Sequence, residues 1–346
     1  MKKILFIHPN NDYTGSTRVL ADVINRNYKN STINIITRDL HGILSELPNV
    51  NIIPIYFLQI KGKDVPIITS LIWRIHALLL VFFYGLSHHT FYINTIIPFY
   101  AAIIGKLLNR EIIYHIHEYF IIKSYLIKLS EFIFKKIEAK RIYVSKYLQS
   151  CYENNPHILS TIEYNRLSDE YKSHIKIRPI NERHRNSIIM ICSLNKHKGL
   201  SMFIKAAKEL SEYNFSLIIS ENEEKIYNYL YNKCGYNDLP TNLIIYPTQS
   251  NIHQFLYNSD LILNLTDYNY IIETFGMTIL EAMAYGIPAI VPNVGGPTEL
   301  IENGYNGFCI DVTNIDILKT SINKILNKAD YPQYVSNTLT KYSYFQ

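Results

Sequence analysis

Two glutamates flank a segment that could bind and position a phosphorylated nucleotide. The stretch Glu273-Thr-Phe-Gly-Met-Thr-Ile-Leu-Glu281 predicts a loop that enters a helix near Thr274 or Phe275. Main-chain N–H groups without a helical partner, together with the helix dipole, favour phosphate at such a start. Glu281 would lie about two turns further along, on the face toward the phosphate. A carboxylate there can accept hydrogen bonds from two neighbouring hydroxyls, as a ribose offers. Glu273 would lie nearer to an attached sugar.

Each of these residues also has a purely structural explanation. Glu273 could be an acidic residue of the kind favoured at a helix N-terminus, and Glu281 a solvated helix residue. Small residues at positions 282, 284 and 286 would let this helix lie close to a sheet. The pair of glutamates alone therefore does not establish a site, and the surrounding elements must decide.

Short apolar segments alternate with helical segments along the whole chain. In the first half, strands are expected at residues 4–8, 33–37, 50–56, 91–95, 112–117 and 141–144. In the second half, strands are expected at 187–193, 215–220, 243–246, 261–265, 288–292 and 308–310, with helices at 200–211, 223–233, 251–257, 275–285 and 315–326. Near-continuous apolar strands between helices are typical of parallel sheets covered on both faces. The pattern predicts an α/β chain with two Rossmann-like domains, whose sheets face each other across a cleft.

A chain of 346 residues is long enough for these two domains. We expect an N-terminal domain at 1–165, a linker at 166–186 and a C-terminal domain at 187–328. The linker is rich in charged residues and histidine and has no sustained apolar period. Residues 329–346 form a tail that is expected to cross back to the N-terminal domain.

The charges are distributed unevenly between the two halves. Residues 1–180 hold 22 Lys and Arg against 13 Asp and Glu, whereas residues 181–346 hold 12 against 16. The net charges of +9 and −4 add to the +5 of the whole chain. A basic first half suggests an anionic partner, and nucleic acid, a phospholipid surface or a lipid pyrophosphate would all fit that charge.

The cysteines and the chain start indicate a reducing compartment. The four cysteines are scattered, with no CxxC pair and no histidine at a metal-ligand spacing. The start, Met1-Lys-Lys-Ile-Leu-Phe-Ile-His8, is too short for a signal-peptide core and predicts a first buried strand. We therefore expect a cytoplasmic protein.

Residues 67–86 are nearly long enough and apolar enough to span a bilayer. Arg74 and His76 interrupt the segment near its middle, and a charge there costs about 2.5–3.5 kcal/mol on insertion scales. We expect a helix packed within the first domain. A helix lying partly in a membrane interface remains the alternative.

The segment 273–299, ETFGMTILEAMAYGIPAIVPNVGGPTE, resembles the signature of the retaining GT-B glycosyltransferases of family 4. The likeness includes the two glutamates, the E-A-M-A-x-G-x-P run and the later Gly295-Gly296-Pro297-x-Glu299. A following turn, Asn303-Gly304-x-x-Gly307, also matches. Several landmarks in order over about 35 residues are a far more specific signal than a lone glycine pattern.

The resemblance implies which residues form the site. It implies Glu273, His117 and Lys198 as catalytic residues. The residues implied for donor binding are Gly15, Ser193, Lys198, Phe275, Gly276, Met277, Thr278 and Glu281. Ser193 stands where many members have an arginine, and Gly15 stands where they have two glycines. His117 could equally be a structural strand-end histidine, and Lys198 a solvated lysine.

The implied reaction transfers a sugar from a nucleoside diphosphate with retention of anomeric configuration. Negative charge develops on the departing pyrophosphate, so fixed positive potential is required there. Lys198 and the N–H groups near 275–277 would supply it. No metal ion and no other cofactor are expected. Glu273 is expected to orient the donor sugar, and the leaving phosphate to assist deprotonation of the acceptor in a front-face attack.

The expected acceptor is a glycan or a polyprenyl-linked glycan, as in bacterial surface polysaccharide synthesis. Residues 67–86 and 123–146 form basic, aromatic stretches that could rest on an anionic membrane at its cytoplasmic face. The alternative for these stretches is an ordinary solvated face.

Other functions also fit parts of the sequence. A soluble enzyme that glycosylates a protein or small molecule, a nucleotide-sugar epimerase and a catalytically silent GT-B scaffold remain alternatives. Nucleic-acid binding would explain the basic half but not the motif of the second half, so no nucleic-acid partner is expected.

Overall fold

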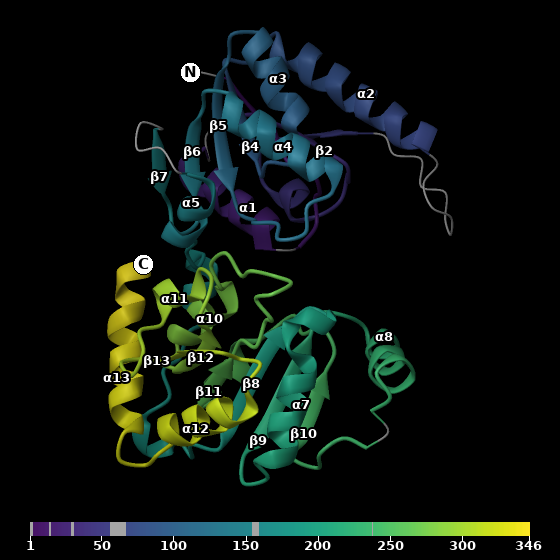
Figure 1. The fold of residues 1–346 in the computed structure, drawn as a ribbon. Helices are drawn as coiled ribbons and strands as arrows, with labels where there is room; N and C mark the ends of the chain where they lie inside the picture. Colours follow the sequence, from purple (N-terminus) through teal and green to yellow (C-terminus); the bar gives the residue numbers. More distant parts are fainter. Residues whose placement is uncertain (1–2, 14, 29–30, 56–66, 154–158, 237) are drawn as a thin grey trace. The chain divides into compact units, whose positions relative to one another are not determined.

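The computed structural model describes residues 3–13, 15–28, 31–55, 67–153, 159–236 and 238–346. The chain divides into two compact units, Met1–Glu163 and Tyr164–Gln346 (Figure 1). The division falls two residues before the predicted domain boundary, and the predicted linker 166–186 is part of the second unit.

The described part of the first unit forms a seven-stranded parallel sheet in the order β3-β2-β1-β4-β5-β6-β7. In chain order the strands are β1 (Ile4–Ile7), β2 (Ile33–Thr37), β3 (Val50–Pro54), β4 (Thr90–Asn94), β5 (Glu111–Ile116), β6 (Lys140–Tyr143) and β7 (Ser160–Ile162). Its helices are α1 (Gly15–Asn27), α2 (Ile67–Gly85), α3 (Phe99–Leu107), α4 (Tyr125–Lys136) and α5 (Lys146–Tyr152), with a 3-10 turn at Ile43–Glu46.

Helices cover both faces of this sheet, which explains why its strands are nearly all apolar. Val19 and Leu20 of α1 pack with Phe6 and Tyr92 on one face. The side chain of Phe91 points to the other face of the sheet, because it alternates with Tyr92 along β4. There it is approached by Gly85 at the end of α2 and by helix α3. Helices α2, α3 and α4 lie side by side.

The described part of the second unit forms a six-stranded parallel sheet in the order β10-β9-β8-β11-β12-β13. The strands are β8 (Ser187–Cys192), β9 (Asn214–Ile219), β10 (Leu243–Tyr246), β11 (Leu261–Leu263), β12 (Ala289–Pro292) and β13 (Gly307–Ile310). The helices are α6 (Asp169–Ser173), α7 (Leu200–Glu209), α8 (Glu223–Tyr227), α9 (His253–Tyr257), α10 (Met277–Met283), α11 (Pro297–Leu300), α12 (Ile315–Ile325) and α13 (Tyr331–Tyr342). Short 3-10 turns lie at Ile180–Glu182, Lys196–Lys198 and Ser343–Phe345.

The predicted strands are confirmed to within about two residues, but two elements differ. Strand β7 was not predicted, because it has only three residues and none of them is fully buried. The helix predicted at 223–233 is instead α8 followed by a π-helical turn, Asn228–Lys233. The predicted tail is α13, which packs against α10 within the second unit.

Helix α2 is a packed helix, as its composition predicted. Ala77 and Val81 are completely buried on its inner side. Within the described ranges, no helix combines the length and the apolar character that a membrane crossing requires.

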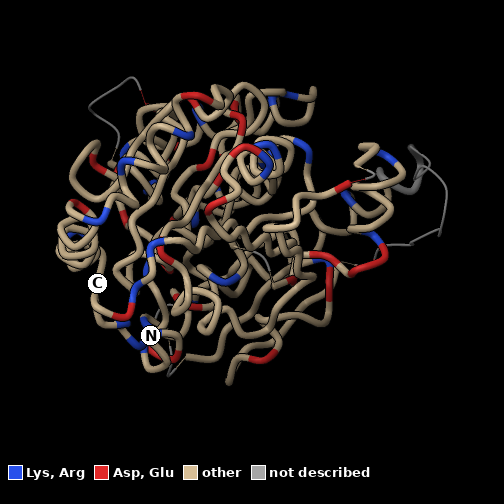
Figure 2. Tube along the Cα trace, turned by 90° about the horizontal axis from the view of Figure 1, so that it is seen from below, with Lys and Arg blue, Asp and Glu red and all other residues tan. Residues whose placement is uncertain are grey.

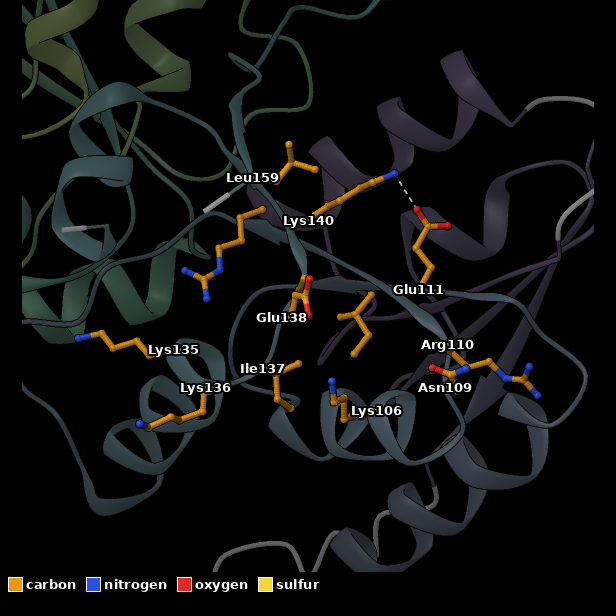
Figure 3. A pocket seen from close by; sticks show the side chains of 13 residues that line it. Lys106, Asn109, Arg110, Glu111, Lys135, Lys136, Ile137, Glu138, Lys140 and Leu159 are labelled. Atoms are coloured by element: carbon orange, nitrogen blue, oxygen red, sulfur yellow. Dashed lines mark hydrogen bonds and ion pairs between the residues drawn. The ribbon is translucent and has the colours of Figure 1, made fainter. Parts of the chain in front are cut away.

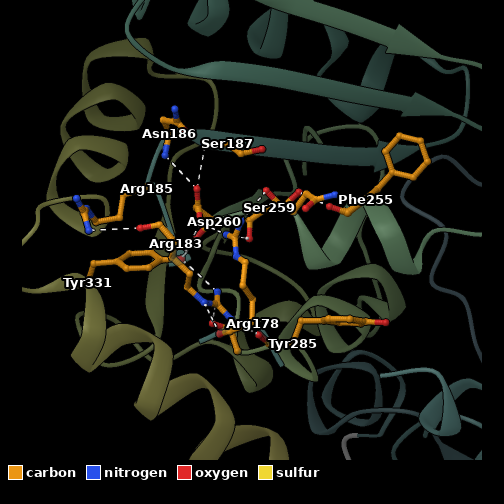
Figure 4. Close-up of polar contacts among 12 residues, drawn as sticks. Arg178, Arg183, Arg185, Asn186, Ser187, Phe255, Ser259, Asp260, Tyr285 and Tyr331 are labelled. Atoms are coloured by element: carbon orange, nitrogen blue, oxygen red, sulfur yellow. Dashed lines mark hydrogen bonds and ion pairs between the residues drawn. The ribbon is translucent and has the colours of Figure 1, made fainter. Parts of the chain in front are cut away.

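A buried ionic cluster attaches the segment that opens the second unit to its sheet (Figure 4). Asp260 is fully buried and pairs with Arg178, while its second oxygen accepts the main-chain N–H groups of Asn186 at 3.0 Å and Ser187 at 3.2 Å. Arg183 donates to the carbonyl of Tyr285 at 2.6 Å. The carboxylate thus connects residue 178, the start of β8 and the residue before β11.

Replacing Asp260 with alanine is expected to reduce the free energy of unfolding by about 3–5 kcal/mol, because Arg178 would remain buried without its counter-charge. Chemical denaturation measures this loss. The control is Lys319→Ala, which breaks an exposed pair with Glu209 and should leave stability unchanged. Equal effects of the two substitutions would contradict the role assigned to the buried cluster.

Candidate active site

The residues predicted for catalysis and donor binding gather at two comparable places in the two sheets. In each sheet, strand order reverses once along the chain, between β1 and β4 in the first and between β8 and β11 in the second. At such a reversal, the loops that follow the two neighbouring strands run to opposite faces of the sheet. They leave a crevice at the carboxyl ends of these strands, which is where ligands bind in open α/β sheets. Gly15 and His117 belong to the first unit, and all the other predicted site residues belong to the second.

In the second unit, the loop after β8 carries Lys198 and is held tightly against the loop after β11. The Asn195 side chain accepts the main-chain N–H of His197 at 2.9 Å and starts a 3-10 turn that ends at Lys198. Gly199 follows with φ 79°, and a Cβ atom there would lie 2.1 Å from the carbonyl oxygen of Leu265. Glycine is therefore required at 199, and it fixes where the Lys198 side chain starts.

This close approach brings Lys198 and Glu273 together as an ion pair. The same carboxylate oxygen, Oε1, also accepts a hydrogen bond of 3.2 Å from the hydroxyl of Thr266, which is buried. The main-chain oxygen of Glu273 accepts the N–H of Gly296 at 2.8 Å. Glu273 is thus held at both its side chain and its backbone, and about a quarter of its side chain remains exposed.

Ser193 lies at the end of β8 with its side chain exposed, and its carbonyl accepts the N–H of Asn195 at 2.8 Å. No cation therefore occupies this position, as the sequence indicated. Thr266 was missed by sequence reasoning. Its position just after a parallel strand, near the loop that contains Glu273, is the signal that could have found it.

The predicted start of the following helix is wrong by two to three residues. Helix α10 begins at Met277, because Gly276 has φ 102°, which lies outside the helical region. Met277 and Thr278 carry the first amides of the helix and are half-buried. Phe275 is buried among Tyr164 and Phe345, so only its main chain could face a ligand.

Glu281 consequently lies about one turn into α10, not two. It is buried, with 9% of its surface exposed. Burial and, second, the charge of Glu281 raise the pKa of Tyr285 to about 12, and they also raise the pKa of Tyr171. Tyr171 comes from α6 in the predicted linker, and its hydroxyl is buried without a hydrogen-bond partner. Sequence reasoning missed these two tyrosines, which lie near enough to the carboxylate predicted to bind ribose to feel its charge.

In the first unit, Gly15, predicted for donor binding, lies at the start of a helix and not in a tight turn. It is the first residue of α1, and a Cβ atom there would have no heavy atom within 4 Å. Its backbone does not have positive φ. A residue with a side chain would therefore fit at position 15.

A chain of four hydrogen bonds connects His117 to a carboxylate in the first unit. His117 Nε2 lies 2.8 Å from Asn94 Oδ1, and Asn94 Nδ2 lies 3.0 Å from His8 Nδ1. His8 Nε2 lies 3.1 Å from the hydroxyl of Thr17, which donates to Asp12 Oδ1 at 2.8 Å. Asn94 ends β4, and His8 and His117 directly follow β1 and β5. The chain therefore spans the reversal of strand order, and its middle members were not predicted.

The carboxylate sets the direction of all four hydrogen bonds. Ionised Asp12 can only accept, so the single hydroxyl hydrogen of Thr17 points to it. His8 then donates from Nε2 and accepts at Nδ1 from the amide nitrogen of Asn94 at 3.0 Å, which is closer to Nδ1 than the main-chain oxygen of Asn94 at 3.3 Å. The amide oxygen of Asn94 consequently faces His117, whose Nε2 must carry a proton. The opposite tautomer of His8 would leave the Thr17 and Asp12 oxygens 2.8 Å apart with no hydrogen between them.

Burial keeps the histidines of this region neutral. It lowers the pKa of His8 to about 4, although the main-chain oxygen of Asn94 and the charge of Asp12 oppose this shift. Burial, then the nearby rings of His115 and His8, lower the pKa of His117 well below its usual value. At neutral pH, His117 is therefore an uncharged ring with its proton on Nε2 and its lone pair on Nδ1.

A strained residue lies beside this cluster. Thr95 has φ 92°, which is unfavourable for a β-branched residue, and its hydroxyl donates to Glu118. Burial raises the pKa of Glu118 to about 8, while the main-chain N–H groups of Ile96 and His117 oppose the shift. Such strain is concentrated at functional sites in proteins, and here it lies where β4 and β5 end.

Replacing Asp12 with asparagine should release the single tautomer of His117. An asparagine amide can donate to Thr17, whose hydroxyl is then free to donate to His8, and every later bond in the chain can reverse. Nitrogen-15 NMR of the imidazole rings identifies which nitrogen carries the proton. Asp39→Asn is the control, because Asp39 accepts the main-chain N–H of Asn11 at 3.4 Å and takes no part in the four hydrogen bonds between Asp12 and His117. An unchanged His117 tautomer in Asp12→Asn would contradict the assignment.

Acidification should destabilise the first unit through His8. The pKa of this ring is about 4 in the folded protein and 6.5 as a model value, so the unfolded chain binds more protons between these pH values. The stability contributed by the neutral ring is complete above pH 6.5 and is lost as pH falls toward 4, with about 2 kcal/mol lost between pH 7 and pH 5. Urea unfolding followed by the fluorescence of Trp73, the single tryptophan, measures this loss. His8→Gln should lose correspondingly less, and equal pH dependence of both proteins would contradict the prediction.

Comparisons with known proteins agree with this geometry. Residues 173–341 match the family model for glycosyl transferases group 1. An uncharacterized glycosyltransferase of Methanocaldococcus jannaschii is 26% identical over 157 residues, which are 44% of this chain and 39% of that protein. The chain therefore spans less than half the length of this curated relative.

Two solved structures resemble the whole chain. Anabaena HepE in complex with UDP-glucose has a TM-score of 0.79 at 18% identity, covering 100% of this chain and 95% of that one. The lipopolysaccharide outer core galactosyltransferase WaaB has a TM-score of 0.74 at 18% identity with the same coverage. At these identities the likeness shows the fold alone, which is the GT-B fold of two Rossmann-like domains. Together with this fold, the match over most of the second unit shows that the second unit resembles the group 1 glycosyl transferases and that the whole chain has the architecture of such enzymes.

Proposed function

We propose that this protein transfers a sugar from a nucleoside diphosphate sugar to a glycan or lipid-linked glycan, with retention of anomeric configuration. The observation that carries the proposal is the arrangement at the strand reversal of the second unit. There a lysine, a carboxylate held by a threonine, and the start of α10 lie together, with a buried glutamate one turn further on. These are the groups that a nucleotide sugar would need.

Lys198 would stabilise the negative charge that develops on the departing pyrophosphate. Each charge-assisted hydrogen bond of this kind is worth about 1.5–3 kcal/mol. Amides of Met277 and Thr278 would add main-chain donors. Because Lys198 is paired with Glu273, phosphate and carboxylate would share its charge when a donor binds. No step of the proposal is assigned to a metal ion.

Glu273 would orient the donor sugar and is not assigned the role of nucleophile. Its Oε1 atom already receives hydrogen bonds from Lys198 and Thr266, which fix the direction of the carboxylate. A retaining reaction through a covalent intermediate would require a carboxylate placed to attack the anomeric carbon. We favour front-face attack, in which a donor phosphate oxygen accepts the proton of the acceptor hydroxyl.

Glu281 would hold the ribose, and UDP is the first nucleotide to test. The proposal of UDP rests on HepE, whose structures contain UDP and UDP-glucose. His117 would contact the sugar or the acceptor as a neutral ring. A cytoplasmic location and a glycan acceptor are part of the proposal. The fold likeness to the galactosyltransferase WaaB is consistent with such an acceptor.

A two-stage experiment tests this function. Thermal shift with UDP-, GDP- and ADP-sugars should raise the melting temperature for one donor, and Glu281→Ala should abolish the rise. No shift with any donor, in a protein shown to be folded, would favour a catalytically silent scaffold.

Turnover of the identified donor is then compared between Glu273→Gln and the unmodified protein. The substitution should lower kcat by about 100-fold or more while the circular dichroism spectrum is unchanged. Glu302→Gln is the matched control, since Glu302 is 63% exposed and lies outside this site. Near-normal turnover of Glu273→Gln would remove Glu273 from the active site.

A further inference from the structure

A cavity lies in the first unit (Figure 3). It has a volume of about 690 Å³. Its walls are the end of α3, the end of α4 and the residues that precede β5, β6 and β7. All of these segments lie at the amino ends of parallel strands. The cavity therefore lies at the sheet edge opposite to the one that carries His8, Asn94 and His117.

The cavity is strongly basic. Six Lys and Arg side chains line it, against the carboxylates of Glu111 and Glu138. Lys140 turns toward Glu111, 2.7 Å away, and Arg141 lies 3.7 Å from Glu153 outside the lining. The four remaining cations have no ion pair in the described part of the chain; they are Lys106, Arg110, Lys135 and Lys136.

One of the basic residues is built into the wall. Arg141 is 3% exposed. Its Cζ atom lies 4.3 Å from the centroid of the Phe134 ring, and its Nη2 atom donates to the main-chain carbonyl of Phe134 at 2.8 Å. Its Nε atom is buried with no hydrogen-bond partner. A buried guanidinium N–H without an acceptor is costly. Arg141 therefore adds a fixed positive charge to the wall of the cavity.

Exposed apolar side chains surround the cavity. Leu107 is 73% exposed and follows Lys106, and Leu159 of the lining is 67% exposed. Phe132 is 56% exposed, and the Lys136 ammonium lies 6.0 Å from its ring. Leu86 is 53% exposed, and its carbonyl accepts a hydrogen bond of 3.1 Å from Arg110. Unpaired cations interleaved with exposed apolar groups match the interface of an anionic bilayer, which offers phosphate above hydrocarbon.

The unit that bears this surface is also the positive one. Residues 1–163 hold 18 Lys and Arg against 11 Asp and Glu, a net charge of +7, whereas residues 164–346 hold 16 against 18, a net charge of −2. Figure 2 marks Lys and Arg in blue and Asp and Glu in red along the Cα trace. The long-range field therefore attracts the first unit, which bears this surface, to an anionic membrane more strongly than the second.

We propose that this cavity and its apolar rim dock the protein on an anionic bilayer, with a lipid phosphate seated among Lys106, Lys135 and Lys136. The proposal has a consequence for the acceptor, which rests on the glycosyl transfer proposed above. His117 follows the last residue of β5, and Glu111 of the cavity is the first. Six residues of strand separate them by about 20 Å. The acceptor of a docked enzyme is therefore a lipid-linked oligosaccharide that reaches this height, not a lipid carrying a single sugar.

Vesicle sedimentation tests the docking surface. The protein should bind vesicles containing phosphatidylglycerol at low salt and should not bind pure phosphatidylcholine. Lys135→Gln/Lys136→Gln should weaken the partition by about tenfold, and Leu107→Ser should also weaken it. The matched controls are Lys205→Gln/Lys208→Gln and Ile317→Ser, which alter exposed residues of the second unit and should not change binding. Equal weakening by the control variants, or absence of binding, would overturn the proposal.

Inorganic phosphate distinguishes a soluble anion from a lipid. If phosphate protects the cavity lysines from acylation while vesicles do not bind, the cavity serves a free anion and the docking proposal is wrong.

Acceptor length tests the consequence for the substrate. Protein bound to phosphatidylglycerol vesicles should transfer sugar at least several-fold faster to a polyprenyl-linked oligosaccharide than to the same lipid with one sugar. Equal use of both acceptors would contradict the inferred height. Donor binding, measured by thermal shift without vesicles, separates this outcome from failure of the proposed transferase function, because it involves neither the cavity nor a lipid.

Discussion

Parallel pairing is the constraint on which the rest of this structure depends. Every loop that follows a strand must return at the same sheet edge, and the reversal of strand order separates two of these loops in each sheet. The chemically useful side chains occupy these positions. Lys198 follows β8 and Thr266 follows β11, while His8 and Asn94 lie at the ends of β1 and β4. Hydrogen bonding of the backbone thus gathers polar residues without requiring them to be close in the sequence.

Three carboxylates that are at least partly buried are held by different partners and serve different purposes. Asp260 is fully buried, and its arginine partner and two main-chain amides make it a structural anchor. Asp12 accepts the hydroxyl hydrogen of Thr17 at 2.8 Å and acts at a distance, by directing the protons of two histidines. Glu273 has a lysine and a hydroxyl on one oxygen but remains partly exposed. Glu273 thus combines fixed geometry with access for a ligand.

The two edges of the first sheet have different chemistry because different segments meet there. The carboxyl edge carries neutral histidines and amides held in a single hydrogen-bonded arrangement. At the amino edge, helix ends and short turns expose lysines and leucines that have few partners. Such a division would let one surface bind lipid while the other retains the fixed geometry that sugar transfer requires. The sheet between them sets their separation through the length of its strands.

The sequence by itself determined the two parallel sheets, because apolar runs of strand length report burial directly. It also predicted Lys198, Glu273 and Glu281 as site residues, through residue types in a specific order. It placed the start of α10 too early, since the backbone angle of Gly276 depends on how the loop packs. Thr266, Tyr171 and the His8–Asn94 relay were decided only by the tertiary structure, because they touch their partners across strands distant in sequence. The basic cavity arises in the same way, from side chains of separate helices and turns that meet at one sheet edge.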